Sequence, residues 1–257
     1  MATKKEIWEK DNFTNKEVKI LINAEIIEYD IKSAGWSLAR EFGYISEKKL
    51  DELSKLDKKT RNIKMGLMKR YNQQLSKKES EALSKARELF IKSNKLSVDQ
   101  IVAIRRDAVF VTRRCNNRTF GHVKFIPKNI YTSYIEFNDV ELYYNSNTVD
   151  VKGINDVVVS KHEKYMLDFF KKYLDLLESG KDSELKKFIT DFVYKYKTKQ
   201  LDQGYYREFN ATSAFRLQER IENNVYVIDT IDSSCFDDVD ITYNFFNYLV
   251  PLCTMLI

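Results

Sequence analysis

The stretch IIEYDIKSAGWSLAREFGYI, residues 26–45, runs from an apolar, strand-like segment into a helix-like one and places an acid at the junction. Asp30 follows the β-branched and aromatic run, and the later spacing of Leu38 and Phe42 is that of one helix face. An acid at this junction is either a helix N-cap, accepting from backbone N–H groups near Ser33, or a functional carboxylate.

The composition of the whole chain favours long helices with some strands. The 257 residues are 43% hydrophobic and 13% aromatic, which is too apolar for a disordered chain. Seven glycines and two prolines are too few for a loop-rich β-sandwich. The formal charge of +5 permits a polyanionic partner without requiring one.

The periodicity predicts an α+β fold, in which helices cover one face of an antiparallel sheet and a mostly helical subdomain follows. Residues 17–30 are typical of a strand or a hairpin, and 98–152 of short antiparallel strands. We expect one subdomain at 1–155, with a short helical insertion at about 46–95. The mostly helical part is 156–257.

The ends of the chain carry no membrane signal. The N-terminus has no apolar segment typical of a secretory signal. Residues 245–257 are strongly apolar but shorter than the roughly 20 residues of a membrane-spanning helix, so we expect a buried terminal helix or a contact with a protein partner. Residues 205–240 are ambiguous. Three widely separated cysteines indicate a reducing compartment, and we expect a cytoplasmic protein.

A second acid lies in QIVAIRRDAVFVTRR, residues 100–114. Asp107 separates two apolar half-runs, which is typical of a β-hairpin. Burying an ionised carboxylate is costly unless cations accompany it. Taken alone, Asp107 is therefore a turn residue that pairs with Arg105, Arg106 or Arg113.

Taken together, the two acids fit a different chemistry. Two carboxylates on adjacent strands that share a pair of divalent cations form the arrangement used for phosphoryl transfer. The segment KKTRNIKMGLMKR supplies a basic helix that could lie over a triphosphate, and Gly66 leaves room for close approach. One face of this helix carries Lys58, Arg61, Asn62, Met65 and Lys69.

These three segments resemble the palm and fingers core of family B DNA polymerases. Motif A of that family reads approximately D-x-x-S-L-Y-P-S, and DIKSAGWS keeps its Asp30, Ser33 and Ser37. Motif B, K-x-x-x-N-S-x-Y-G, is similar to KKTRNIKMG, and motif C, D-T-D-S, is similar to RRDAVFV. The three elements occur in the family's order. The resemblance implies a palm-like subdomain at 1–155 with a fingers insertion at about 46–95, followed by a thumb-like subdomain at 156–257.

The resemblance implies a template-directed nucleotidyltransferase that holds Mg²⁺ or Mn²⁺ on Asp30 and Asp107. It implies primer-template nucleic acid and nucleoside triphosphates as partners, and it suits a virus or mobile element, which would place the protein in the host cytoplasm. The nucleotide-binding residues would be Ser33, Lys58, Arg61, Asn62 and Gly66.

The sequence departs from the family at several places, which include motifs A and C. Ala34, Gly35 and Trp36 stand where Leu, Tyr and Pro are usual, so the steric filter against a ribose 2′-hydroxyl is not evident. Arg105 replaces the first acid of motif C, which would place a cation beside the metals. We expect no N-terminal proofreading exonuclease, because residues 1–25 leave no room for one.

Two other functions are open. The first is a catalytically inactive palm derivative that binds nucleic acid or nucleotides within a replication or transcription complex, a possibility that Arg105 favours. The second is a structural protein that binds a partner through its apolar C-terminus. Neither requires a metal.

Overall fold

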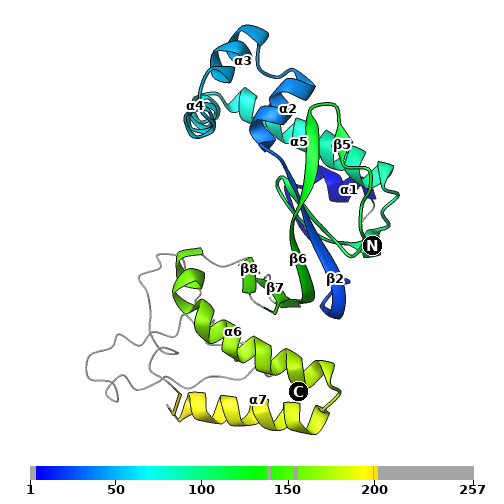
Figure 1. Ribbon diagram of the computed structural model, residues 1–257, viewed down its shortest axis with the longest axis vertical. Helices are drawn as coiled ribbons and strands as arrows, with labels where there is room; N and C mark the ends of the chain where they lie inside the picture. Colours follow the sequence, from blue (N-terminus) through cyan, green and yellow to red (C-terminus); the bar gives the residue numbers. More distant parts are fainter. Residues whose placement is uncertain (1–3, 138–139, 147, 153–155, 199, 202–257) are drawn as a thin grey trace, which may run out of the picture. The chain divides into compact units, whose positions relative to one another are not determined.

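The computed structural model describes residues 4–137, 140–146, 148–152, 156–198 and 200–201, which form two compact units (Figure 1). Unit 1 consists of residues 1–19 and 24–131, and unit 2 of residues 20–23 and 132–257. The contacts thus divide the chain at Tyr131, whereas the sequence suggested a division near residue 155. Each unit is described by itself.

Unit 1 is built on an antiparallel sheet. Its strands lie in the order β1-β3-β4-β2-β6, and the short β5 pairs with β6. β3 and β4 form a tight hairpin, and β4 pairs with β2 on its other side. The strand bounds are Asn12–Thr14 (β1), Ile20–Ile31 (β2), Ile101–Arg105 (β3), Ala108–Val111 (β4), Thr119–Phe120 (β5) and Val123–Phe137 (β6).

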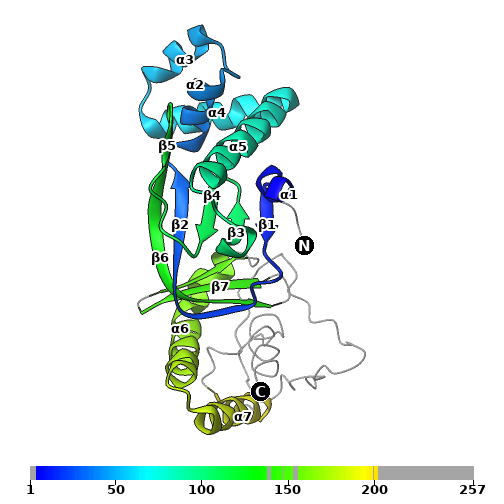
Figure 2. The same ribbon diagram turned by 90° about the vertical axis from the view of Figure 1, so that its right-hand side faces the viewer.

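The helices of unit 1 form two groups (Figure 2). α5, Gln73–Ser93, lies across the sheet because Leu83, Ala86 and Phe90 form an apolar stripe that joins the main core. The second group surrounds a smaller core of Ala39, Ile45, Leu53, Met65 and Leu75. Its members are α2 (Ala34–Phe42), α3 (Glu47–Ser54) and α4 (Lys58–Tyr71); α1 (Lys4–Glu9) and the 3₁₀ turn η1 (Val98–Gln100) complete unit 1.

Unit 2 combines a meander with two helices. β6 continues into β7, Val140–Asn145, and β8, Thr148–Lys152, through antiparallel pairs. α6, Asp156–Glu178, and α7, Asp182–Lys197, pack through aromatic rings, with Phe169 of α6 lying 4.6 Å from Phe192 of α7 between ring centroids.

The predicted α+β class, with helices on an antiparallel sheet, is confirmed. Residues 20–31 form one strand rather than a hairpin. Asn23 is the last residue of the segment 20–23 that belongs to unit 2, and it has a left-handed φ of 53°. The segment 205–240 and the apolar C-terminus lie outside the described residues. In the described part of the chain, no helix is long and apolar enough to cross a membrane.

Candidate metal and nucleotide site

The two predicted acids come together at one end of the unit 1 sheet. Asp30, near the end of β2, pairs in register with Ala108, the first residue of β4. Asp107 lies in the two-residue turn between β3 and β4, and its carbonyl accepts from the N–H of Ile31 at 3.1 Å. Residues 77 positions apart (107 minus 30) are therefore neighbours, as the sequence predicted.

Burial and like charge dominate the electrostatics of this pair, although Lys128 partly offsets them. Burial, and then the nearby charge of Asp107, raise the pKa of Asp30 above its ordinary value. Asp30 Oδ1 is buried and accepts no hydrogen bond. Buried carboxylate oxygens are normally satisfied by donors or metals, so a divalent cation fits the donor set here.

Lys128 of β6 is a cation that the sequence reading missed. Its Nζ lies 3.2 Å from Asp30 Oδ2 and 3.2 Å from Oε1 of Glu28, which is almost fully buried. Burial opposes the charge of Lys128, but Glu28 and Asp30 outweigh it and raise its pKa. Asn129 Nδ2 and Tyr131 Oη also donate to Glu28. One sequence feature could have indicated that a cation lies here: the i, i+2 spacing of Glu28 and Asp30 places both acids on one face of β2.

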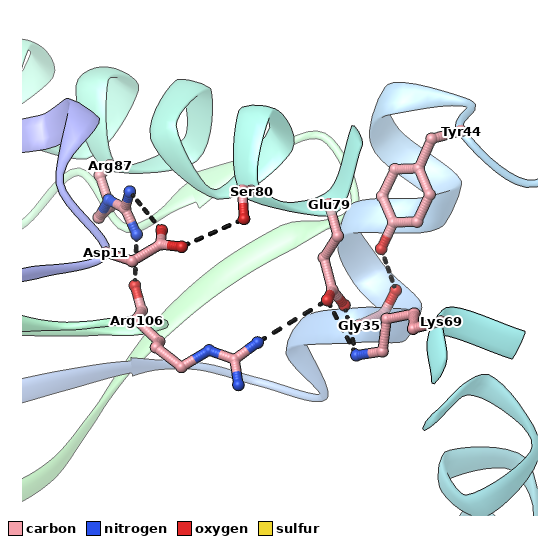
Figure 3. A network of polar contacts seen from close by, with 8 residues as sticks. All are labelled: Asp11, Gly35, Tyr44, Lys69, Glu79, Ser80, Arg87 and Arg106. Atoms are coloured by element: carbon pink, nitrogen blue, oxygen red, sulfur yellow. Dashed lines mark hydrogen bonds and ion pairs between the residues drawn. The ribbon is translucent and has the colours of Figure 1, made fainter. Parts of the chain in front are cut away.

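The turn that carries Asp107 is fixed by a buried arginine (Figure 3). Arg87 of α5 is 0% exposed and donates to the carbonyls of Trp8 at 2.8 Å and Arg106 at 2.7 Å. It also pairs with Asp11 at 3.1 Å. The N–H of Arg106 donates to the Asp11 carbonyl at 2.6 Å, and Arg106 has the left-handed φ of 53° that this tight turn requires.

Arg105 does not lie where the sequence reading placed it. Its guanidinium donates to the carbonyl of Phe13 at 2.9 Å and to Thr14 Oγ1 at 2.7 Å, both on β1. β1 pairs with β3 on the side away from β4 and β2, so Arg105 contacts the strand farther from Asp30. The expectation of a cation beside the acids at this position was wrong; Lys128 takes that place.

The structure also tests the simpler roles considered for the two acids, a turn residue for Asp107 and a helix N-cap for Asp30. Asp107 does lie in a hairpin turn. Asp30 is not a helix N-cap, because it lies within β2 and the N-cap of α2 is Ser33. Ser33 has φ of 53°, and its carbonyl accepts from Ser37 Oγ at 3.0 Å, which closes the bend between β2 and α2.

The basic helix forms as predicted, but some residues of its predicted nucleotide-facing side contact other helices and others are exposed to solvent. Arg61 lies 4.7 Å above the ring of Trp36, and Lys69 Nζ donates to both carboxylate oxygens of Glu79 at 2.9 Å. These side chains thus contact α2 and α5. Lys58 and Asn62 are exposed, and a Cβ at the exposed Gly66 would meet nothing within 4 Å.

Gly35, where the chain departs from motif A, has a physical explanation in the structure. A Cβ at this position would lie 3.3 Å from Glu79 Oε1 and 3.4 Å from Met65 Cε. The Gly35 carbonyl accepts from Tyr44 Oη at 2.9 Å (Figure 3). Burial, and then the charge of Glu79, raise the pKa of Tyr44. The missing side chain thus leaves room for a buried carboxylate that the sequence reading did not single out.

The comparison with protein families gives one result. The family model described as Bacteriophage PBS1 gene 130 protein matches residues 1–257. The chain belongs to this family. The expectation of a viral protein is thereby confirmed at the level of a phage family. Comparison with curated proteins finds no match.

Proposed function

We propose that this phage-family protein is a metal-dependent nucleotidyltransferase that extends a primer on a template, with Asp30 and Asp107 as its metal ligands. The observation that carries the proposal is the meeting of these two carboxylates at a sheet end, with Asp30 Oδ1 buried and without a donor. Two carboxylates from adjacent strands are the core of two-metal sites.

In the proposed reaction the metal and the protein side chains would have separate roles. Mg²⁺ or Mn²⁺ bound there would lower the pKa of the attacking hydroxyl and neutralise charge on the leaving phosphate. Asp30 and Asp107 would hold it, and the buried Arg87 fixes the turn that carries Asp107. Lys128, half exposed beside Asp30, adds positive charge where a phosphate would approach. Lys58, Arg61, Asn62, Gly66 and Ser33 are the proposed nucleotide contacts, and α6 and α7 the proposed thumb.

A second candidate, binding without catalysis, also has an observation in its favour. Within the residues that the structure describes, no three acidic, histidine or cysteine side chains are grouped as a metal site, so the acid pair stands alone. Lys128 already forms an ion pair with Asp30. A protein of this kind would bind primed template or nucleotide within a replication or transcription assembly and would not extend the primer.

Nucleotide incorporation with Asp107→Asn separates the two functions. We expect Mg²⁺- or Mn²⁺-dependent extension of a primed template by the wild type and a loss of about 100-fold or more in the variant, because one metal ligand is removed. The matched control is Asp51→Asn on the exposed surface of α3, which should retain activity. Binding of primed template without extension by the wild type would overturn the enzyme and support the binding protein.

A further inference from the structure

Glu79 on α5 is a buried acid that holds two cations from different elements (Figure 3). Its side chain is only 6% exposed. Both its oxygens accept from Lys69 of α4 at 2.9 Å, and Oε2 lies 3.8 Å from a terminal nitrogen of Arg106 in the β3–β4 turn. Two elements distant in the sequence therefore point their cations at one carboxylate.

The charges of this cluster do not balance. Lys69 and Arg106 bring two positive charges to the single carboxylate of Glu79, so this carboxylate alone does not neutralise them. Arg106 is 64% exposed and Lys69 is partly exposed, whereas the acid is buried. A solvent anion can therefore reach the cations without first passing the carboxylate. A phosphate is well matched to them, because it offers more charge and more acceptor oxygens than a carboxylate.

The cluster lies close to the acid pair along the chain and in space. Arg106 immediately precedes Asp107 in the turn that Arg87 fixes. Glu79 touches the position of Gly35, at the start of the helix that follows Asp30. A nucleotide whose reacting phosphorus lies at the acid pair would have its other phosphates near these cations.

We propose that Lys69 and Arg106 bind the polyphosphate of the incoming nucleotide, and that Glu79 occupies this cation pair in the unliganded protein. The inference rests on the proposed nucleotidyltransferase function; it adds Arg106 and the competing Glu79 to Lys69, which the sequence already placed on the basic face of α4. Glu79 acts as an internal competitor, so an arriving polyphosphate must take its two cations from it. Removing the charge of Glu79 should then strengthen anion binding, the opposite of what loss of an ordinary binding residue does.

Calorimetric titration of the full chain with inorganic tripolyphosphate in metal-free buffer tests this inference. We expect Glu79→Gln to bind the probe about five- to tenfold more tightly than the wild type, and Lys69→Met and Arg106→Met to bind it about five- to tenfold more weakly. Because the probe needs neither Asp30, Asp107 nor a metal, the result is independent of the primer-extension test.

Matched controls separate a local effect from net charge. Glu88→Gln makes the same change on the same helix, at a partly exposed acid paired with Lys92, and should leave affinity for the probe unchanged. Arg114→Met removes an exposed cation paired with Glu25, and its effect should be far smaller than that of Arg106→Met.

Several results would overturn the inference. These are no tripolyphosphate binding by the wild type, equal or weaker binding by Glu79→Gln, or equal losses in Arg106→Met and Arg114→Met. If circular dichroism shows that Glu79→Gln does not fold, Arg106→Met becomes the deciding variant. Its side chain is exposed, so replacing it does not disturb the hydrophobic core. Unchanged probe binding in that variant contradicts the proposal, and a loss beyond that of Arg114→Met supports it.

Discussion

The turn that carries Asp107 and the basic helix α4 belong to the same unit but are held in different ways. The turn is fixed by Arg87, which is fully buried and makes three polar contacts beside the main core. α4 is held by one small apolar core, a ring contact and an ion pair. Elements with few buried contacts open at lower free energy than core elements. We infer that the acid pair is rigid and that the cationic helix can adjust.

The strongest test of this comparison is Arg87→Met. The carbonyls of Trp8 and Arg106 would lose their donor and Asp11 would lose its cation, so we expect the free energy of unfolding to fall by about 3 kcal/mol. Urea denaturation measures this change. Arg114→Met, which breaks an exposed pair with Glu25, is the control and should cost much less. Equal losses in the two variants would contradict the rigid turn.

The second test concerns the pH dependence of stability in metal-free buffer. The pKa of Asp30 is raised in the folded protein, so between its unfolded and folded values the native state binds more protons. This group therefore makes the free energy of unfolding fall as pH rises through its folded pKa. Asp107→Asn removes the neighbouring charge and should stabilise the metal-free protein at neutral pH by on the order of 1 kcal/mol.

Urea denaturation of the wild type and Asp107→Asn from pH 4 to pH 8 measures this effect. The advantage of the variant should grow with pH, and added Mn²⁺ should stabilise the wild type more than the variant. A variant that is less stable than the wild type throughout the pH range would show that the two carboxylates do not repel each other.

The smallest effect is expected on the α4 side. The contact of Arg61 with the ring of Trp36 should contribute about 0.5–1 kcal/mol, as measured by a double-mutant cycle of Trp36→Leu and Arg61→Met in urea denaturation. A coupling energy near that of Arg87 with Asp11, measured in the same way, would remove the distinction between a fixed turn and an adjustable helix.

The sequence predicted the elements of the site better than it predicted their surroundings. Asp30 and Asp107 were identified because each interrupts or ends an apolar run, and that pattern depends only on neighbouring residues. Lys128 could not be found in this way, since it meets Glu28 across 100 residues of sequence. Arg105 was placed wrongly because the sequence does not say toward which neighbouring strand a long side chain will turn.

Glu79 illustrates a further limit. On a mostly polar helix, an acid looks like a solvated residue, and only the packing of α2 and α4 against α5 makes it buried. The unusual Gly35 was visible in the sequence as a departure from the motif. The sequence does not show that Glu79 fills the space beside Gly35, because the two residues are 44 positions apart (79 minus 35) and meet only in the folded chain.

The division of the chain also bears on how the protein is made. Unit 2 takes residues 20–23 from before most of unit 1 and residues from 132 onward from after it, and the strand β6 runs through the boundary. On the ribosome, residues 24–131 emerge between the two contributions to unit 2. We therefore expect unit 1 to form first, at a stage when the unit 2 residues that follow Tyr131 have not yet been synthesised and residues 20–23 lack their contacts. A chain truncated at Tyr131 would end within β6, and we expect its unpaired strand edges to promote aggregation.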